Sequence, residues 1–138
     1  MSYDFMMFKP RIRISSPDDL GEDSILKQDP QSVVDELNKL FLGIVWRRET
    51  DGGWFGSLDN EEGWFEFRIG AEPDYAWSIH TSLRMSARTT ISRICAALKL
   101  IAFDGQQNVV IDPRIKAPRF ARRPDGMRRE ERSIGAPR

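Results

Sequence analysis

Four consecutive short segments between residues 44 and 83 are separated by turn-forming sequences, and the last two alternate apolar with polar side chains. The segments are 44–48, 54–58, 64–69 and 75–83, and the turns between them are 51–53, 59–63 and 71–74. In the third segment, for example, Phe65, Phe67 and Ile69 fall on one side of an extended chain. Such a period of two is typical of an antiparallel meander with one face on a core and the other in water.

A further strand and a helix are predicted before the meander. Residues 1–8 place Tyr3, Phe5 and Met7 on one side of an extended segment, which stops before a proline. The polar stretch 15–28 is predicted to be mostly loop. Asp29 suits an N-cap and the proline after it suits the first helical position, so a helix is predicted over residues 30–42.

A second helix and a last strand are predicted after the meander. The helix covers residues 87–103, and its apolar stripe consists of Ile91, Ile94, Cys95, Leu98, Ile101 and Ala102. The strand covers residues 109–111 and stops before an Asp-Pro pair. The order β-α-β-β-β-β-α-β predicts an α+β fold, in which two helices pack on one face of a mainly antiparallel sheet.

The charges divide the chain into two parts. Residues 1–113 carry 12 basic and 18 acidic side chains, a net charge of −6, whereas residues 114–138 carry nine basic and three acidic ones. The second part also has three prolines and few apolar residues, which cannot bury enough surface to offset the entropy of ordering. We therefore predict a single α+β domain at 1–113 and a basic, flexible tail at 114–138.

The cysteine count and hydropathy indicate a compartment. Cys95 is the only cysteine, so an internal disulfide is impossible, and a packed thiol in a reducing compartment is expected. No apolar stretch approaches the roughly 20 residues of a membrane span. A strand also begins where a secretory leader would have to stand, so we expect a cytoplasmic protein.

The sequence offers few residues for catalysis. His80 is the only histidine, and one histidine with one cysteine cannot build a zinc site, so no metal, cofactor or catalytic residue is predicted. Glu61 and Glu62 are adjacent in a turn and do not have the spacing of a glycosidase acid pair. A small enzyme that uses His80 with an acid stays a further hypothesis, and it requires a pocket at His80 with a carboxylate in reach.

Tryptophans and acids gather on the meander. The candidate partner-binding residues are Trp54, Asp59, Glu61, Glu62, Trp64, Glu66, Glu72 and Asp74. Aromatic anchors contribute much of the binding energy of interfaces, and acidic residues around them suit a basic partner. The alternative interpretation is structural: the tryptophans belong to the core and the acids form a solvated face.

The first eight residues, Met-Ser-Tyr-Asp-Phe-Met-Met-Phe, resemble an N-terminus that small bacterial immunity proteins of polymorphic and type VI toxin systems often have, Met-Ser-Tyr-Asp-Leu-Met-Val-Phe. The helix after Asp29-Pro30, the Trp-bearing meander and the strand before Asp112-Pro113 are also similar to that family. The basic tail departs from its usual ending. The resemblance covers residues 1–113 loosely.

The resemblance implies an immunity protein that neutralises a cognate bacterial toxin by occluding its active site, with no chemistry of its own. The implied partner is a protein toxin, such as a basic nuclease or ADP-ribosyltransferase domain, and no membrane partner is expected. The alternative is a non-enzymatic, nucleic-acid-associated adaptor, in which arginines of the tail bind phosphates. These arginines are Arg119, Arg122, Arg123, Arg128, Arg129 and Arg132.

Overall fold

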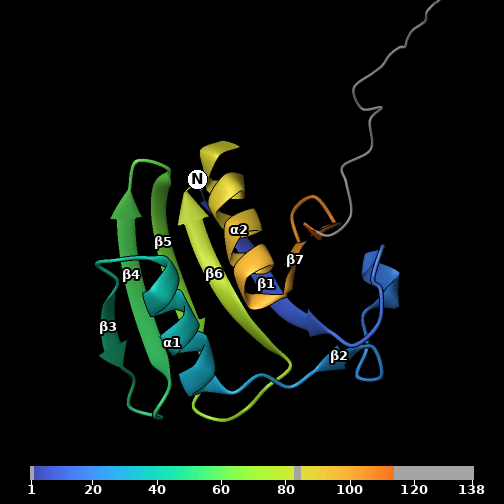
Figure 1. Cartoon of the computed structure of the whole chain (residues 1–138), viewed down its shortest axis with the longest axis horizontal. Helices are drawn as coiled ribbons and strands as arrows, with labels where there is room; N and C mark the ends of the chain where they lie inside the picture. Colours follow the sequence, from blue (N-terminus) through green and yellow to red (C-terminus); the bar gives the residue numbers. More distant parts are fainter. Residues whose placement is uncertain (1, 83–84, 114–138) are drawn as a thin grey trace, which may run out of the picture.

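A computed structural model describes residues 2–82 and 85–113 of the chain. The predicted tail at 114–138 lies outside the described residues, as does the end of the fourth meander segment at Leu83. Within the described ranges, one antiparallel sheet and two α-helices form the α+β fold that the sequence predicted (Figure 1).

The described residues form an eight-stranded sheet. Its strands are β1 (Ser2–Pro10), β2 (Ile25–Leu26), β3 (Val45–Arg48), β4 (Trp54–Asn60), β5 (Gly63–Ile69), β6 (Ala76–Ser82), β7 (Ile101–Asp104) and β8 (Val109–Ile111). Their order is β3-β4-β5-β6-β1-β7-β8, and β2 pairs with the end of β1. The N-terminal strand is therefore an interior strand, between β6 and β7, and not an edge.

The predicted meander is confirmed as β3 to β6. Each strand pairs with the next, and the register joins Trp54 to Ile69 and Phe67 to Ile79. The tight β3–β4 turn depends on Gly52, whose φ of 91° lies in the left-handed region that glycine adopts without strain. The Asp51 carboxylate also stabilises this turn, because it accepts a hydrogen bond from the backbone N–H of Gly53 at 2.8 Å.

Both helices lie on the same face of the sheet, as predicted (Figure 1). Helix α1 spans Pro30–Leu40, and the Asp29 carboxylate caps it by accepting a hydrogen bond from the backbone N–H of Ser32 at 3.0 Å. Helix α2 spans Met85–Leu98. In the part of the chain that the structure describes, no helix is long and apolar enough to cross a membrane.

The prediction that the second helix continues to residue 103 is wrong. Helix α2 ends at Leu98, Lys99 has a positive φ of 59°, and the backbone N–H of Leu100 bonds back to the Cys95 carbonyl at 2.9 Å. Ile101 and Ala102 lie instead in β7, where both are fully buried. The spacing of Ile101 and Ala102 also fits the apolar stripe of a longer helix. As part of a strand between β1 and β8, however, both side chains are buried and their backbone groups pair with the neighbouring strands.

The segment between β1 and α1 is more ordered than the predicted loop. It contains a 3₁₀ turn at Pro17–Asp19 and the short strand β2. Ile14 is fully buried and Ile25 is 5% exposed, although neither belongs to the main core cluster. This segment therefore buries two apolar side chains outside the main core cluster.

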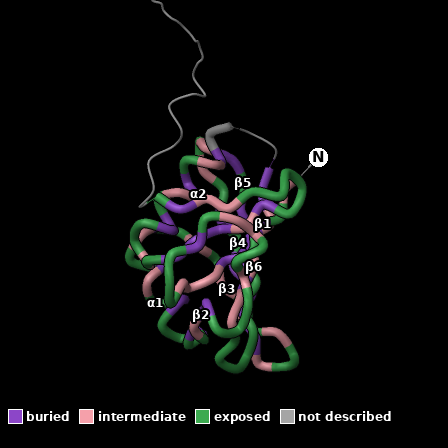
Figure 2. Tube along the Cα trace, turned by 90° about the vertical axis from the view of Figure 1, so that its right-hand side faces the viewer, coloured by how far each residue is buried: buried purple, intermediate pink, exposed green. Residues whose placement is uncertain are grey.

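The main core lies between the sheet and the two helices (Figure 2). Strand residues such as Phe5, Phe67 and Ile79 are fully buried there, and Leu37 of α1 and Ile91 of α2 close the core from the other side. The opposite face of the same strands has neither helix on it.

Candidate functional site

The face of the sheet opposite the two helices, which we call the open face, carries aromatic and charged side chains of β1, β3, β4, β5 and β6. The strand register places on it Asp4, Met6, Val45, Arg47, Phe55, Ser57, Asp59, Trp64, Glu66, Arg68, Ser78 and His80. Trp64 and Met6 are each 37% exposed. Because large apolar side chains in contact with water often mark interaction sites, the open face is the candidate interface.

A group that we call the Trp64 cluster extends over β1, β6, β5 and the end of β4 on the open face. It consists of Asp4, Asp59, Trp64, Glu66 and His80, which are joined by the cross-strand pairs Asp59–Trp64, Glu66–His80 and Asp4–His80. The rings of Trp64 and His80 are 5.3 Å apart at 52°. The Thr81 hydroxyl also donates a hydrogen bond to the backbone carbonyl of Trp64 at 2.8 Å, which holds the strand at this position.

His80 has a fixed orientation within this cluster. Its Nδ1 atom lies 2.5 Å from an oxygen of the Asp4 carboxylate. An ionised carboxylate has no proton to donate and serves only as a hydrogen-bond acceptor. The His80 ring is thus held between a carboxylate and the Trp64 ring, with 36% of its side chain exposed. The enzyme hypothesis required a carboxylate near His80, and Asp4 satisfies that condition.

A second group, the Phe55 stack, lies next to the Trp64 cluster on β3, β4 and β5. The guanidinium groups of Arg47 and Arg68 lie 4.5 and 4.8 Å from the centre of the Phe55 ring. Glu49 joins the two arginines through contacts of 3.5 Å to each. The ring is only 8% exposed, because long arginine side chains cover it while their charged ends stay in water.

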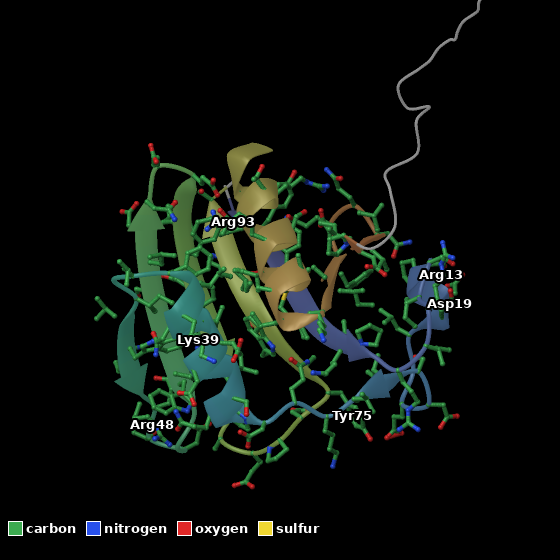
Figure 3. All side chains as sticks on the ribbon, viewed as in Figure 1. Arg13, Asp19, Lys39, Arg48, Tyr75 and Arg93 are labelled. Carbon is green, nitrogen blue, oxygen red and sulfur yellow. The ribbon has the colours of Figure 1, made fainter. Side chains whose placement is uncertain are left out.

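The structure does not bring Trp54 and Trp64 together, although the sequence analysis placed both at one site. Trp54 faces the helices, where it is packed against the core beside Trp46 at a ring distance of 5.9 Å. The Arg48 guanidinium lies 4.1 Å from the Trp54 ring centre (Figure 3). The Trp46 indole in turn donates a hydrogen bond to Asn38 of α1 at 2.8 Å. Trp54 therefore belongs to the packing of the covered face.

The predicted acidic residues also separate into groups. Asp59 and Glu66 share the open face with Trp64, whereas Glu61 is exposed in the β4–β5 turn. Glu62 is half-buried on the helix side, where Arg93 of α2 contacts it at 3.7 Å (Figure 3).

Glu72 and Asp74 lie in the β5–β6 turn, at the other end of β5. At about 3.3 Å per residue, the first and last of the seven residues of β5 are roughly 20 Å apart. The backbone of Asp74 pairs with that of Gln28, which attaches this turn to the start of α1. Glu72 and Asp74 therefore do not form one patch with the acids near Trp64.

Asp4 and Met6 belong to the candidate site but were missed. Both stand on the polar side of the first strand, a position that the alternation of residues 1–8 already indicated. The alternation does not predict which strand pairs with the first strand in the sheet. The pairing of β1 with β6 brings residues 76 positions apart, Asp4 and His80, into contact.

Cys95 does not contribute to a reactive site. It belongs to α2 and is fully buried in the core, and burial, with a smaller effect from Asp112, raises the pKa of its thiol to about 12. A thiol with such a pKa stays protonated at neutral pH and is a poor nucleophile. Residues 2–82 and 85–113 also contain no group of three or more His, Cys, Asp or Glu side chains that could hold a metal ion.

Comparisons of the chain with models of known protein families, with curated proteins and with solved structures found no match.

Proposed function

We propose that this chain is a non-enzymatic, cytoplasmic immunity-type protein that binds a cognate bacterial toxin through its open face and occludes the toxin's active site. The observation that carries the proposal is the Trp64 cluster, a partly exposed tryptophan that shares its sheet face with three carboxylates, opposite the two described helices. The resemblance of Met1–Phe8 to immunity proteins supplies the class of partner.

Trp64 has the properties of a binding anchor. Its ring offers a large apolar surface, and tryptophan is among the residues most enriched at binding hot spots. The strand pairing of β5 and the contact with His80 hold the ring before any partner arrives. Because less side-chain freedom is then lost on association, more of the contact energy is available as affinity.

The charges around Trp64 favour a basic partner. Asp4, Asp59 and Glu66 share the open face with Trp64, and residues 1–113 as a whole have a net charge of −6. A basic toxin domain, such as a nuclease or an ADP-ribosyltransferase, would be steered toward this face by its charge.

The Phe55 stack would select the orientation in which a partner binds. Arg47 and Arg68 present positive charge beside the negative Trp64 cluster, on neighbouring positions of the same strands. A partner with a basic region opposite the cluster and an acidic one opposite the stack fits in one orientation, while the reversed orientation brings like charges together.

The alternative, a nucleic-acid-associated adaptor, depends on arginines of the tail, which lie outside the described residues. The open face does not favour it, because three carboxylates around Trp64 repel phosphate groups.

The first test is co-expression with the toxin domain encoded by a neighbouring gene, followed by calorimetry on the purified pair. We expect rescued cells and a one-to-one complex. Trp64→Ala should weaken binding by about 30-fold, the loss typical of a hot-spot residue. Glu66→Lys should also weaken binding, whereas Glu72→Lys, the same charge reversal in the distant β5–β6 turn, should leave the affinity unchanged.

Two results would contradict the proposal. If Trp64→Ala binds as tightly as the unchanged protein, the open face is not the interface. If no complex forms and cells are not rescued, the immunity function itself is wrong, and the His80–Asp4 pair and the basic tail become the features to study.

A further inference from the structure

A cavity of about 580 Å³ lies between the start of α1, the end of α2 and the strands β1 and β2. The cavity lies on the helix side of the sheet and shares no lining residue with the Trp64 cluster. Its apolar wall includes Leu26, Leu98 and Leu100, with Val33 of α1. This volume is in the range of small-molecule binding sites, about 300–1,000 Å³.

Lysines are concentrated at this cavity. Among the described residues there are four lysines, and three of them, Lys9, Lys27 and Lys99, line it. In the part of the chain that the structure describes, none of the three forms a salt bridge, and Lys27 alone has a cation–π contact, 5.6 Å from the centre of the Tyr75 ring. Three ammonium groups are therefore available to a ligand.

The acidic side chains of the same wall are already engaged. An oxygen of Asp29 accepts hydrogen bonds from the backbone N–H and the hydroxyl of Ser32, both at 3.0 Å. Glu36 pairs with Lys39, which does not line the cavity, at 2.9 Å. Glu36 is thus paired with a cation outside the lining, whereas Asp29 keeps its negative charge at the N-terminus of α1. Three lysines against this one carboxylate leave the cavity with a net positive charge.

We propose that this cavity binds a small amphipathic anion, an aliphatic chain that ends in a carboxylate or a phosphate. The leucines and Val33 would contact the chain, and the lysines would contact the head group as point charges. The lining contains no aromatic side chain, which favours a flexible aliphatic body over a planar ring. This binding is independent of the toxin-binding function of the open face.

The protein has a built-in reporter for this site. Gln28 lines the cavity and is buried, and its amide oxygen accepts a hydrogen bond from the Trp77 indole N–H at 2.8 Å. A ligand that contacts Gln28 should therefore shift the Trp77 indole signal in a proton–nitrogen NMR spectrum. The Trp64 indole, on the open face, should not respond.

The test titrates the full chain with octanoate, octyl phosphate and 1-octanol, the last having the same chain without charge. Saturable binding of an anion with a shift of the Trp77 signal supports the proposal, and the tighter of the two anions identifies the head group. If neither anion binds, or if 1-octanol binds as tightly as both, the assignment is overturned.

A triple variant, Lys9→Gln, Lys27→Gln and Lys99→Asn, tests the role of charge. Asparagine is chosen because it tolerates the positive φ at residue 99, and the thermal unfolding of the variant should stay close to that of the unchanged protein. Anion binding should weaken by at least about tenfold, as the sum of three modest contributions. Arg13→Gln, which removes one exposed charge outside the lining, should leave binding unchanged (Figure 3). Unaltered binding by the triple variant would overturn the proposal.

Discussion

Both faces of the sheet carry aromatic residues, but the exposure and the neighbours of these residues differ. On the covered face Phe65 and Phe67 are 1% and 0% exposed, while their neighbour Trp64 on the open face is 37% exposed. The covered face is closed by two helices, so its rings contact one another. The Phe67 ring lies 6.1 Å from Trp46 and 6.5 Å from Trp77.

Phe55 and Trp64 on the open face have charged or polar partners, as does Trp54 on the covered face, which lies 4.1 Å from the Arg48 guanidinium. Phe55 lies between two arginines, and Trp64 lies against His80 beside Asp4. Such partners keep their charged ends in water and still order the ring. The comparison teaches that helices bury the rings of one face, whereas on the other face side chains of neighbouring strands cover Phe55 and leave Trp64 37% exposed, which is why we propose Trp64 as the binding anchor.

The largest expected effect is on the covered face. Phe67→Ala should lower the free energy of unfolding by about 3–5 kcal/mol, because it leaves a cavity where a fully buried ring stood. Trp64→Ala should cost only about 1–2 kcal/mol, because part of that ring is already in water. Urea denaturation of both variants measures the difference, and similar losses would show that the two faces do not differ as argued.

The second prediction concerns pH and the covered face alone. Burial raises the pKa of the Cys95 thiol from 9.0 to about 12, so the folded state binds this proton more tightly than the unfolded chain. The resulting stability is fully present below pH 9 and is lost as the pH rises toward 12. The slope should approach about 1.4 kcal/mol per pH unit above pH 9.

The Cys95→Ala variant is the control for this effect. Other groups titrate in the same range, so the measured quantity is the difference in slope between the two proteins in urea denaturation at pH 8 to 10.5. If both lose stability equally with pH, the thiol is not protected by the core.

Much of the fold was predictable because the strands repeat one local pattern. The meander and α1 follow from alternation, turns and the Asp29 cap, each of which acts within a few residues. Ile101 and Ala102 were assigned to the wrong element because apolar residues just after a helix suit either a further turn or a strand. Only the pairing of β7 with β1, nearly a hundred residues earlier, decides between them.

The candidate site was predictable in part for the same reason. Trp64 and Glu66 were placed on the polar side of the third segment, and they share the open face. Trp54 could not be placed from its own segment, because Trp54, Gly56 and Leu58 alternate with Phe55, Ser57 and Asp59, and both sets contain an aromatic residue. The packing of Trp46 against Gly56, where an added Cβ would lie 2.6 Å from the indole, shows which set faces the helices.

The smallest expected effect tests whether charged partners stabilise a ring of the open face. A double-mutant cycle with Arg47→Ala and Phe55→Leu isolates the contact of one guanidinium with the ring, and a second cycle uses Arg68→Ala. Each coupling should be about 0.5–1 kcal/mol, the usual value for an exposed cation–π pair. Because Glu49 contacts both arginines at 3.5 Å, the cycles should be repeated in Glu49→Gln, where the coupling to Phe55 should persist. A coupling that disappears with Glu49 would mean that the arginines are held by the carboxylate alone and that Phe55 is merely covered by them.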